Sequence, residues 1–162
     1  AKDKYKSEVS TISDNENPII NSLSSFSLKS FSYTRKLKYP NYIGKILPNE
    51  IPSILSSCIL SLDTDGHNDL LFSAMANNCA CLSANETVLS TEYMPKVLNL
   101  EELITCMKAI MLKKSFREEH IEKCHRFVME SHTYFHRASD MFSLLGYKEY
   151  SKSCLNKLEE YV

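Results

Sequence analysis

Residues 49–82, NEIPSILSSCILSLDTDGHNDLLFSAMANNCACL, decide the fold class that we predict for this chain. In the first half the apolar residues recur every three or four positions, which is the spacing of one buried face of an α-helix. They are Ile51, Ile54, Leu55, Cys58, Ile59 and Leu62. The same period continues in the second half at Leu71, Met75, Cys79 and Leu82. This stretch therefore predicts two successive helices.

The connection between them, LDTDGHNDL at 62–70, holds three carboxylates, a Gly and a His, so we considered a calcium loop. A loop of the EF-hand type that starts at Asp63 needs Gly at its sixth position and Glu at its twelfth. The chain has Asn68 and Ala74 there. We therefore predict a turn between two helices, in which Gly66 supplies a positive φ.

The second half of the chain has further helix signals. Asn99 and Glu102 have the spacing of a capping box, which predicts a helix from residue 100. An apolar seam with alternating spacings of three and four predicts a long helix over 116–145, which Gly146 ends. A last helix is predicted over 148–161.

Residues 1–48 differ in composition from the rest. The segment from Asn17 to Asn49 has no Asp or Glu, is rich in Ser, and alternates basic with aromatic residues. Pro18, Pro40 and Pro48 interrupt any long helix. We expect an extended arm over 1–48 that packs on or leads into a helical domain over 49–162. The predicted fold is all-α, with about five helices in a bundle or helical-hairpin stack after an extended N-terminal arm.

Composition excludes several classes of function. The net charge is -1, and only three Gly occur, so a Gly-rich phosphate-binding loop cannot be built. The six Cys mostly lie in apolar stripes, which favours free buried thiols in a reducing compartment. We expect an intracellular protein, cytoplasmic or nuclear, and no cofactor. Because the chain starts at Ala1 without Met, we also expect it to be part of a longer protein.

Two groups of residues were considered as metal ligands. Cys79 and Cys81 would point about 200° apart on a helix, so they could not share one ion. The stripe His125, His132 and His136 flanks an apolar seam, where half-buried His is common. We therefore predict no metal site.

Two segments resemble known families. RFVMESH at 126–132 is similar to the Arg–His motif of HEPN-type helical ribonucleases, which implies that Arg126 and His132 would act on RNA. It departs from that motif at Phe127, where a polar residue is usual.

Residues 135–158 resemble a single tetratricopeptide-type or MIT-type helical hairpin, with Ser139, Phe142, Gly146 and Ser151 at the expected positions. This second resemblance implies a groove that binds a partner without catalysis.

The function expected from the sequence is a non-catalytic module for protein–protein interaction, a scaffold or adaptor that holds a partner protein in a groove between helices. The residues expected to bind the partner are Tyr134, Arg137, Tyr147 and Tyr150, since Tyr and Arg are enriched at interfaces. Two alternatives remain open besides self-association: the ribonuclease, and a nucleic-acid-binding domain that uses its basic arm. The arm residues for that contact are Lys29, Arg35, Lys36 and Lys38.

Overall fold

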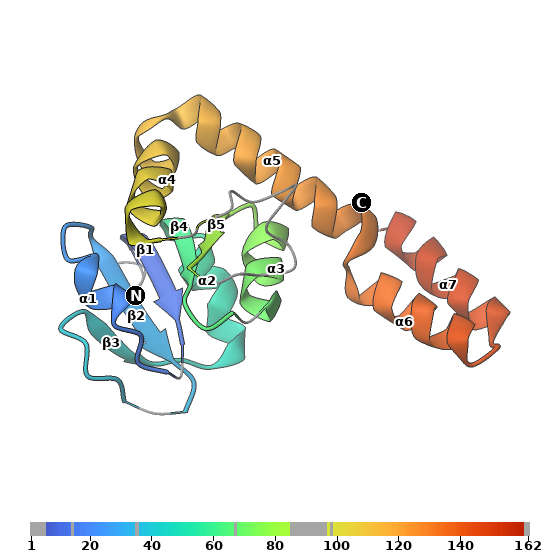
Figure 1. Ribbon diagram of the computed structural model, residues 1–162. Helices are drawn as coiled ribbons and strands as arrows, with labels where there is room; N and C mark the ends of the chain where they lie inside the picture. Colours follow the sequence, from blue (N-terminus) through green and yellow to red (C-terminus); the bar gives the residue numbers. More distant parts are fainter. Residues whose placement is uncertain are drawn as a thin grey trace.

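A computed structural model describes residues 6–13, 15–34, 36–66, 68–84, 97 and 99–160 of the chain. Its centre is a five-stranded parallel sheet with helices on both sides (Figure 1). The strands are β1 (Ser7–Ile12), β2 (Leu28–Ser32), β3 (Tyr42–Lys45), β4 (Cys58–Asp63) and β5 (Ala80–Ser83).

The strand order is β3-β2-β1-β4-β5, and every neighbouring pair is parallel. The chain places β2 and β3 successively on one side of β1, and it then crosses back to place β4 on the other side. The direction in which the sheet grows therefore reverses between β1 and β4.

The helices are α1 (Ile19–Ser22), α2 (Ile51–Leu55), α3 (Asn68–Ala76), α4 (Leu100–Leu112), α5 (Lys114–Ser131), α6 (Tyr134–Leu144) and α7 (Lys148–Glu159), with a short 3-10 turn η2 (Pro48–Glu50) before α2. None of the helices in the described part of the chain combines the length and the apolar composition needed to cross a lipid bilayer.

The core has two sides because neighbouring residues of a strand point to opposite faces of the sheet. Leu82 packs with Met107 of α4 and Ile20 of α1, whereas Cys81 packs with Leu71 of α3 and with α5. Helix α5 follows α4 and packs against both α3 and β5. Beyond it, α6 and α7 form a hairpin that projects from the body of the molecule (Figure 1).

The all-α prediction is wrong, since the structure contains a parallel sheet. The first predicted helix, whose apolar face was to run from Ile51 to Leu62, ends at Leu55, and Cys58–Asp63 forms β4. The second predicted helix ends at Ala76, and Ala80–Ser83 forms β5. Short apolar runs satisfy helical and strand spacing equally well, because Cys58, Leu60 and Leu62 also alternate.

The prediction of an extended N-terminal arm outside the fold is also wrong, because β1, β2 and β3 of the sheet lie within residues 1–48. Their many Ser residues suggested an irregular segment. Ser10, Ser30 and Ser32 are instead buried in the sheet. The Ser10 hydroxyl donates to Cys58 Sγ at 3.0 Å, and the Ser32 hydroxyl lies 2.9 Å from the Tyr42 hydroxyl. These hydrogen bonds offset the desolvation of the hydroxyl groups.

Several local predictions are confirmed. The Asn99 side chain accepts a hydrogen bond from the Glu102 N–H at 2.9 Å and caps α4. Gly146 has a φ of 81° just beyond α6, and Gly66 has a φ of 74° after β4. The helix predicted over 116–145 is interrupted, however, because α5 ends at Ser131 and Thr133 caps a separate helix α6.

Candidate functional site

Polar side chains gather where β1 and β4 end. Ser13 and Asn15 follow β1, whereas Asp63 and Asp65 lie at and beyond the end of β4. In open parallel sheets, ligands bind in the crevice outside the carboxyl ends of the strands, at the point where the strand order reverses. This sheet reverses between β1 and β4. The candidate functional site is therefore this carboxyl edge.

Asp65 joins the two loops at this edge. Its Oδ2 accepts hydrogen bonds from the Ser13 hydroxyl at 2.6 Å and from the Asn15 side-chain amide at 3.4 Å. The Asn15 N–H donates in turn to the Ser13 hydroxyl oxygen at 2.9 Å. Ser13 is buried, Asp65 is half-buried and Asn15 is exposed, so the group leads from the sheet out to solvent.

Asp63 shapes the loop in which Asp65 lies. Its Oδ1 accepts from the backbone N–H groups of Asp65 and Gly66, each at 3.1 Å. Its Oδ2 accepts from the Ser83 hydroxyl at 2.8 Å, which connects the end of β4 to the end of β5. Asp63 is buried, and its contacts fix the backbone of the loop. Asp63 is thus a positioning residue for Asp65.

A third loop at this edge, the one after β2, contains Tyr39 and contacts Asn17 in the loop after β1. The Asn17 amide donates to the Thr64 carbonyl at 2.8 Å, and its backbone N–H donates to the Tyr39 hydroxyl. Next to Tyr39, the backbone N–H of Lys38 donates to the Glu16 carboxylate at 3.2 Å. The loops after β1, β2 and β4 therefore form one hydrogen-bonded rim.

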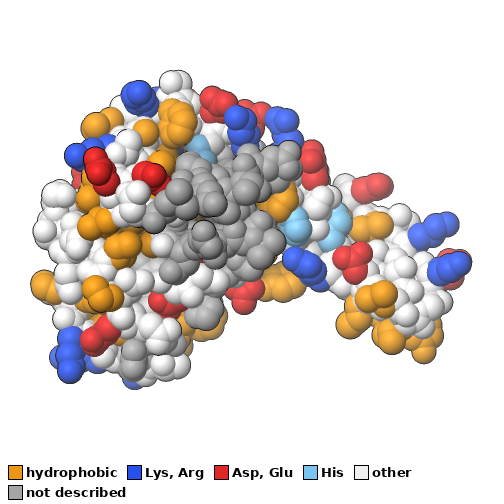
Figure 2. Space-filling model, viewed as in Figure 1, with side chains coloured by type: hydrophobic (Ala, Val, Ile, Leu, Met, Phe, Trp, Pro, Cys, Tyr) orange, Lys and Arg blue, Asp and Glu red, His pale blue; other side chains and the backbone are white. Residues whose placement is uncertain are grey.

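The residues predicted to bind a partner separate into two places. Tyr134 and Arg137 line a cavity of about 420 Å³ between α3 and the corner where α5 meets α6. Tyr147 and Tyr150 lie at the other end of the hairpin, in edge-to-face contact with ring centroids 6.2 Å apart. Figure 2 shows hydrophobic side chains gathered at that far end. The structure thus brings the four residues together as two pairs.

His132 forms part of the wall of this cavity. Its ring is tilted by 45° against Phe127 at a centroid distance of 4.2 Å and stacks with Phe72 at 5.2 Å. Loss of hydration, together with the nearby Arg137 and His136, lowers the pKa of His132. Arg126, its partner in the ribonuclease hypothesis, forms an exposed ion pair with Glu122 at 2.6 Å.

The other His residues considered as metal ligands have separate partners. A ring nitrogen of His125 lies 3.1 Å from the Met75 carbonyl oxygen. The ring of His136 contacts the Thr133 hydroxyl at 2.8 Å. The His125 ring therefore contacts α3, and the His136 ring contacts the residue that caps its own helix α6.

The residues predicted to contact nucleic acid are dispersed. Lys29 is half-buried on β2, whereas Lys36 and Lys38 are exposed in the loop after that strand. Arg35 lies outside the described residues. The exposed lysines therefore lie in a loop at the same carboxyl edge as Asp65, because they follow the end of β2.

A second polar cluster, not anticipated from the sequence, is buried where β5 meets α5. Cys81, His120 and Cys124 approach one another there. The hydrogen-bonding contact between Cys81 and Cys124 lowers the pKa of Cys124, although burial opposes this shift. The same contact raises the pKa of Cys81, and burial raises it further. The expectation that Cys79 and Cys81 diverge on a helix was wrong, since this segment is extended.

Comparisons with known proteins give no family for this chain. No family model, no curated protein and no solved structure matches it. The resemblance of residues 135–158 to a tetratricopeptide-type or MIT-type hairpin is therefore wrong as a family assignment.

Proposed function

We propose that this protein binds a small hydroxyl-bearing molecule, such as a sugar or a nucleoside, at the carboxyl edge between β1 and β4. The observation that supports this most directly is the contact of Asp65 with Ser13 and Asn15 across the point where the strand order reverses. Such points are where open α/β sheets usually hold ligands. The proposal concerns binding without turnover.

The chemistry of the rim favours hydroxyl groups. The Asp65 carboxylate accepts hydrogen bonds and repels anions, whereas the Asn15 amide and the Ser13 hydroxyl both donate and accept. A hydroxyl group also donates and accepts, so it can satisfy every member of this set. An ammonium group only donates, so it could not accept from the second N–H of the Asn15 amide, the one that is not directed at Asp65.

The test is calorimetric titration of the protein with a panel of free sugars and nucleosides. We expect at least one to bind, and Asp65→Ala to weaken it at least about tenfold, because a hydrogen bond to a charged group contributes roughly 1.5–3 kcal/mol. The matched control is Asp140→Ala, which removes an exposed carboxylate on α6 and should leave the affinity unchanged. Equal affinities for Asp65→Ala and the original chain would refute the site.

A second function, binding of a partner protein without catalysis, is supported by the hairpin α6–α7. Its Tyr134 side chain is 93% exposed beside the cavity that Arg137 also lines, and Tyr and Arg are enriched at interaction surfaces. We propose a scaffold or adaptor role for this hairpin, through contact with another protein.

We also propose an intracellular, reducing compartment for this protein. The Sγ atoms of Cys58 and Cys79 lie 3.7 Å apart as free thiols, which supports this proposal.

This second function is tested by capturing partners from a cell extract with the original chain and with a Tyr134→Ser, Arg137→Ala double variant. A partner held at the hairpin should be lost from the double variant while the melting temperature stays unchanged. Lys152→Ala, an exposed change on α7, is the control and should retain it. Retention by the double variant, or recovery of nucleic acid alone, would argue against this role.

A further inference from the structure

The cluster of Cys81, His120 and Cys124 presents three potential metal ligands in one buried place. The two sulfur atoms and an imidazole nitrogen all lie within 4.8 Å of one another. Cys81 and Cys124 are fully buried, and His120 is 6% exposed. Buried polar groups of this kind need partners, because an unsatisfied one destabilises the fold.

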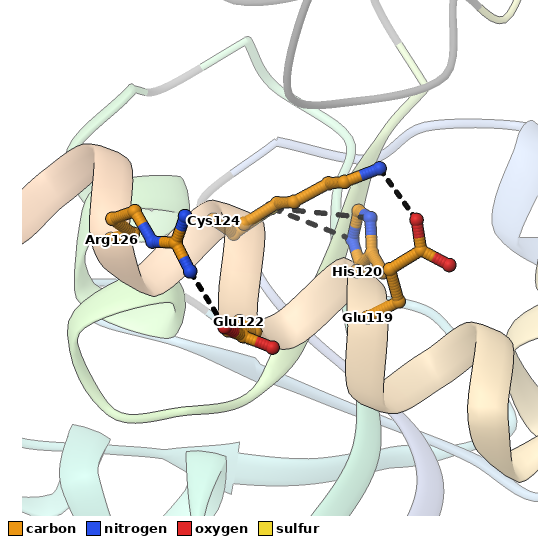
Figure 3. A network of polar contacts seen from close by, with 6 residues as sticks. Glu119, His120, Glu122, Cys124 and Arg126 are labelled. Atoms are coloured by element: carbon orange, nitrogen blue, oxygen red, sulfur yellow. Dashed lines mark hydrogen bonds and ion pairs between the residues drawn. The ribbon is translucent and has the colours of Figure 1, made fainter.

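Two elements assemble the cluster. Cys81 lies on β5, and His120 and Cys124 lie one turn apart on α5, so they share one side of that helix. Figure 3 shows His120 and Cys124 next to each other, with the ion pair of Glu122 and Arg126 on another side of α5. The cluster therefore joins the edge of the sheet to the helix that covers it.

The imidazole ring of His120 contacts both Cys81 and Cys124. Its Nε2 lies 2.9 Å from the Cys81 carbonyl oxygen, which only accepts, so the neutral ring carries its hydrogen on Nε2. The lone pair is then on Nδ1, and Cys124 Sγ lies 4.0 Å from Nδ1 and 3.8 Å from Nε2. A metal-bound His usually donates its other N–H to a backbone carbonyl or a carboxylate in this way.

We propose that Cys81, His120 and Cys124 form a binding site for one thiophilic metal ion, with Cu(I) as the best match. Thiolate and imidazole ligands favour Cu(I) and Zn(II) over Mg(II) or Ca(II). Zn(II) is usually four-coordinate, whereas Cu(I) is satisfied by three ligands. Cysteine binds as thiolate, so the thiol protons pass to solvent when the ion enters. This site is independent of the ligand proposed for the carboxyl edge.

A second pair of thiols must be separated from this site in any experiment. Cys58 and Cys79 have their Sγ atoms 3.7 Å apart and could hold Cu(I) between two sulfurs. They are on the same side of the sheet core as Cys81 and Cys124. The double variant Cys58→Ser, Cys79→Ser removes this alternative and is the matched control.

The experiment is an anaerobic titration of the reduced full chain with Cu(I), in competition with a chromophoric Cu(I) chelator. Because the site is buried, the ion is added both to folded protein and during refolding. We expect one tightly bound equivalent, which Cys58→Ser, Cys79→Ser retains. Cys124→Ser should weaken binding at least about 100-fold, since even partners outside the ligand shell cost 10–100-fold. Circular dichroism checks that each variant folds.

X-ray absorption of the loaded original chain keeps the proposal testable if Cys124→Ser does not fold. The proposed site predicts two sulfur ligands and one nitrogen ligand around the ion. No bound equivalent, loss of binding in Cys58→Ser, Cys79→Ser, or a shell of sulfur alone would each overturn the proposal.

Discussion

At the scale of single residues, several polar side chains of this protein are buried in its core and hydrogen-bonded there. Asp63 is buried and accepts hydrogen bonds from two backbone N–H groups and from Ser83. Ser10 and Ser32 are buried in the central strands, and each has a named partner. Such contacts contribute little net free energy, but losing one partner leaves the other unsatisfied, which costs about 1–3 kcal/mol. The contacts of Asp63 therefore specify the loop after β4, and those of Ser10 and Ser32 connect neighbouring strands.

His132 should make stability depend on pH. Its pKa is lowered in the folded protein by loss of hydration and by Arg137 and His136, so folding favours the neutral ring. The stability that this provides is present above the unfolded pKa of about 6.5 and is lost as the pH falls through that value toward the folded pKa. Urea unfolding at about pH 7.5 and about pH 5.5 should show a larger loss for the original chain than for His132→Gln. Equal losses would contradict this.

At the scale of elements, the sequence signals succeed where they are local. The spacing of Asn99 and Glu102 predicted α4 because a capping box involves only one turn. The strands β4 and β5 were missed because their apolar residues fit either period. The strands β1 and β2 were missed because Ser occupies buried positions that parallel strands normally fill with apolar residues.

Removal of the α4 cap should destabilise the protein measurably. Asn99→Ala removes the acceptor of the Glu102 N–H, and the loss of such a cap typically costs about 1 kcal/mol. Urea unfolding measures the change in the free energy of unfolding. Asn156→Ala, an exposed change inside α7, is the control and should change stability little. An Asn99→Ala variant as stable as the original chain would show that the cap has no energetic role.

At the scale of the whole molecule, the α/β body and the hairpin α6–α7 differ in how they are held. Among the described residues, the buried apolar clusters draw their members from positions up to Val128 and include none from α6 or α7. The two hairpin helices pack chiefly on each other. The body therefore contains the residues that determine cooperative folding, and the hairpin is an appended element.

This division predicts that a chain ending at Ser131 still folds. It should unfold in one cooperative transition, with a melting temperature within a few degrees of the full chain. A chain ending at Leu112 lacks Cys124 and Val128, which are buried against α3, and should not unfold cooperatively. Loss of cooperative unfolding in the chain ending at Ser131 would show that the hairpin belongs to the folding unit.

The candidate site shows why sequence alone was insufficient at this scale. A turn between two helices was predicted around Gly66 as a local feature; the positive φ of Gly66 is confirmed, but the turn connects the strand β4 to α3. The contact of Asp65 with Ser13 and Asn15 joins positions about fifty residues apart in the chain. Only the strand order brings those loops together, and the local spacing of residues does not encode that order.

The most direct test of the proposed ligand site is an amide ¹H–¹⁵N spectrum of the protein, recorded with and without the sugar or nucleoside that binds most tightly. The proposal predicts that the largest shifts fall on Ser13, Asn15 and the loop from Asp63 to Gly66. Shifts confined to the cavity beside His132 and Arg137, or to the hairpin, would contradict it and would place the ligand outside the carboxyl edge.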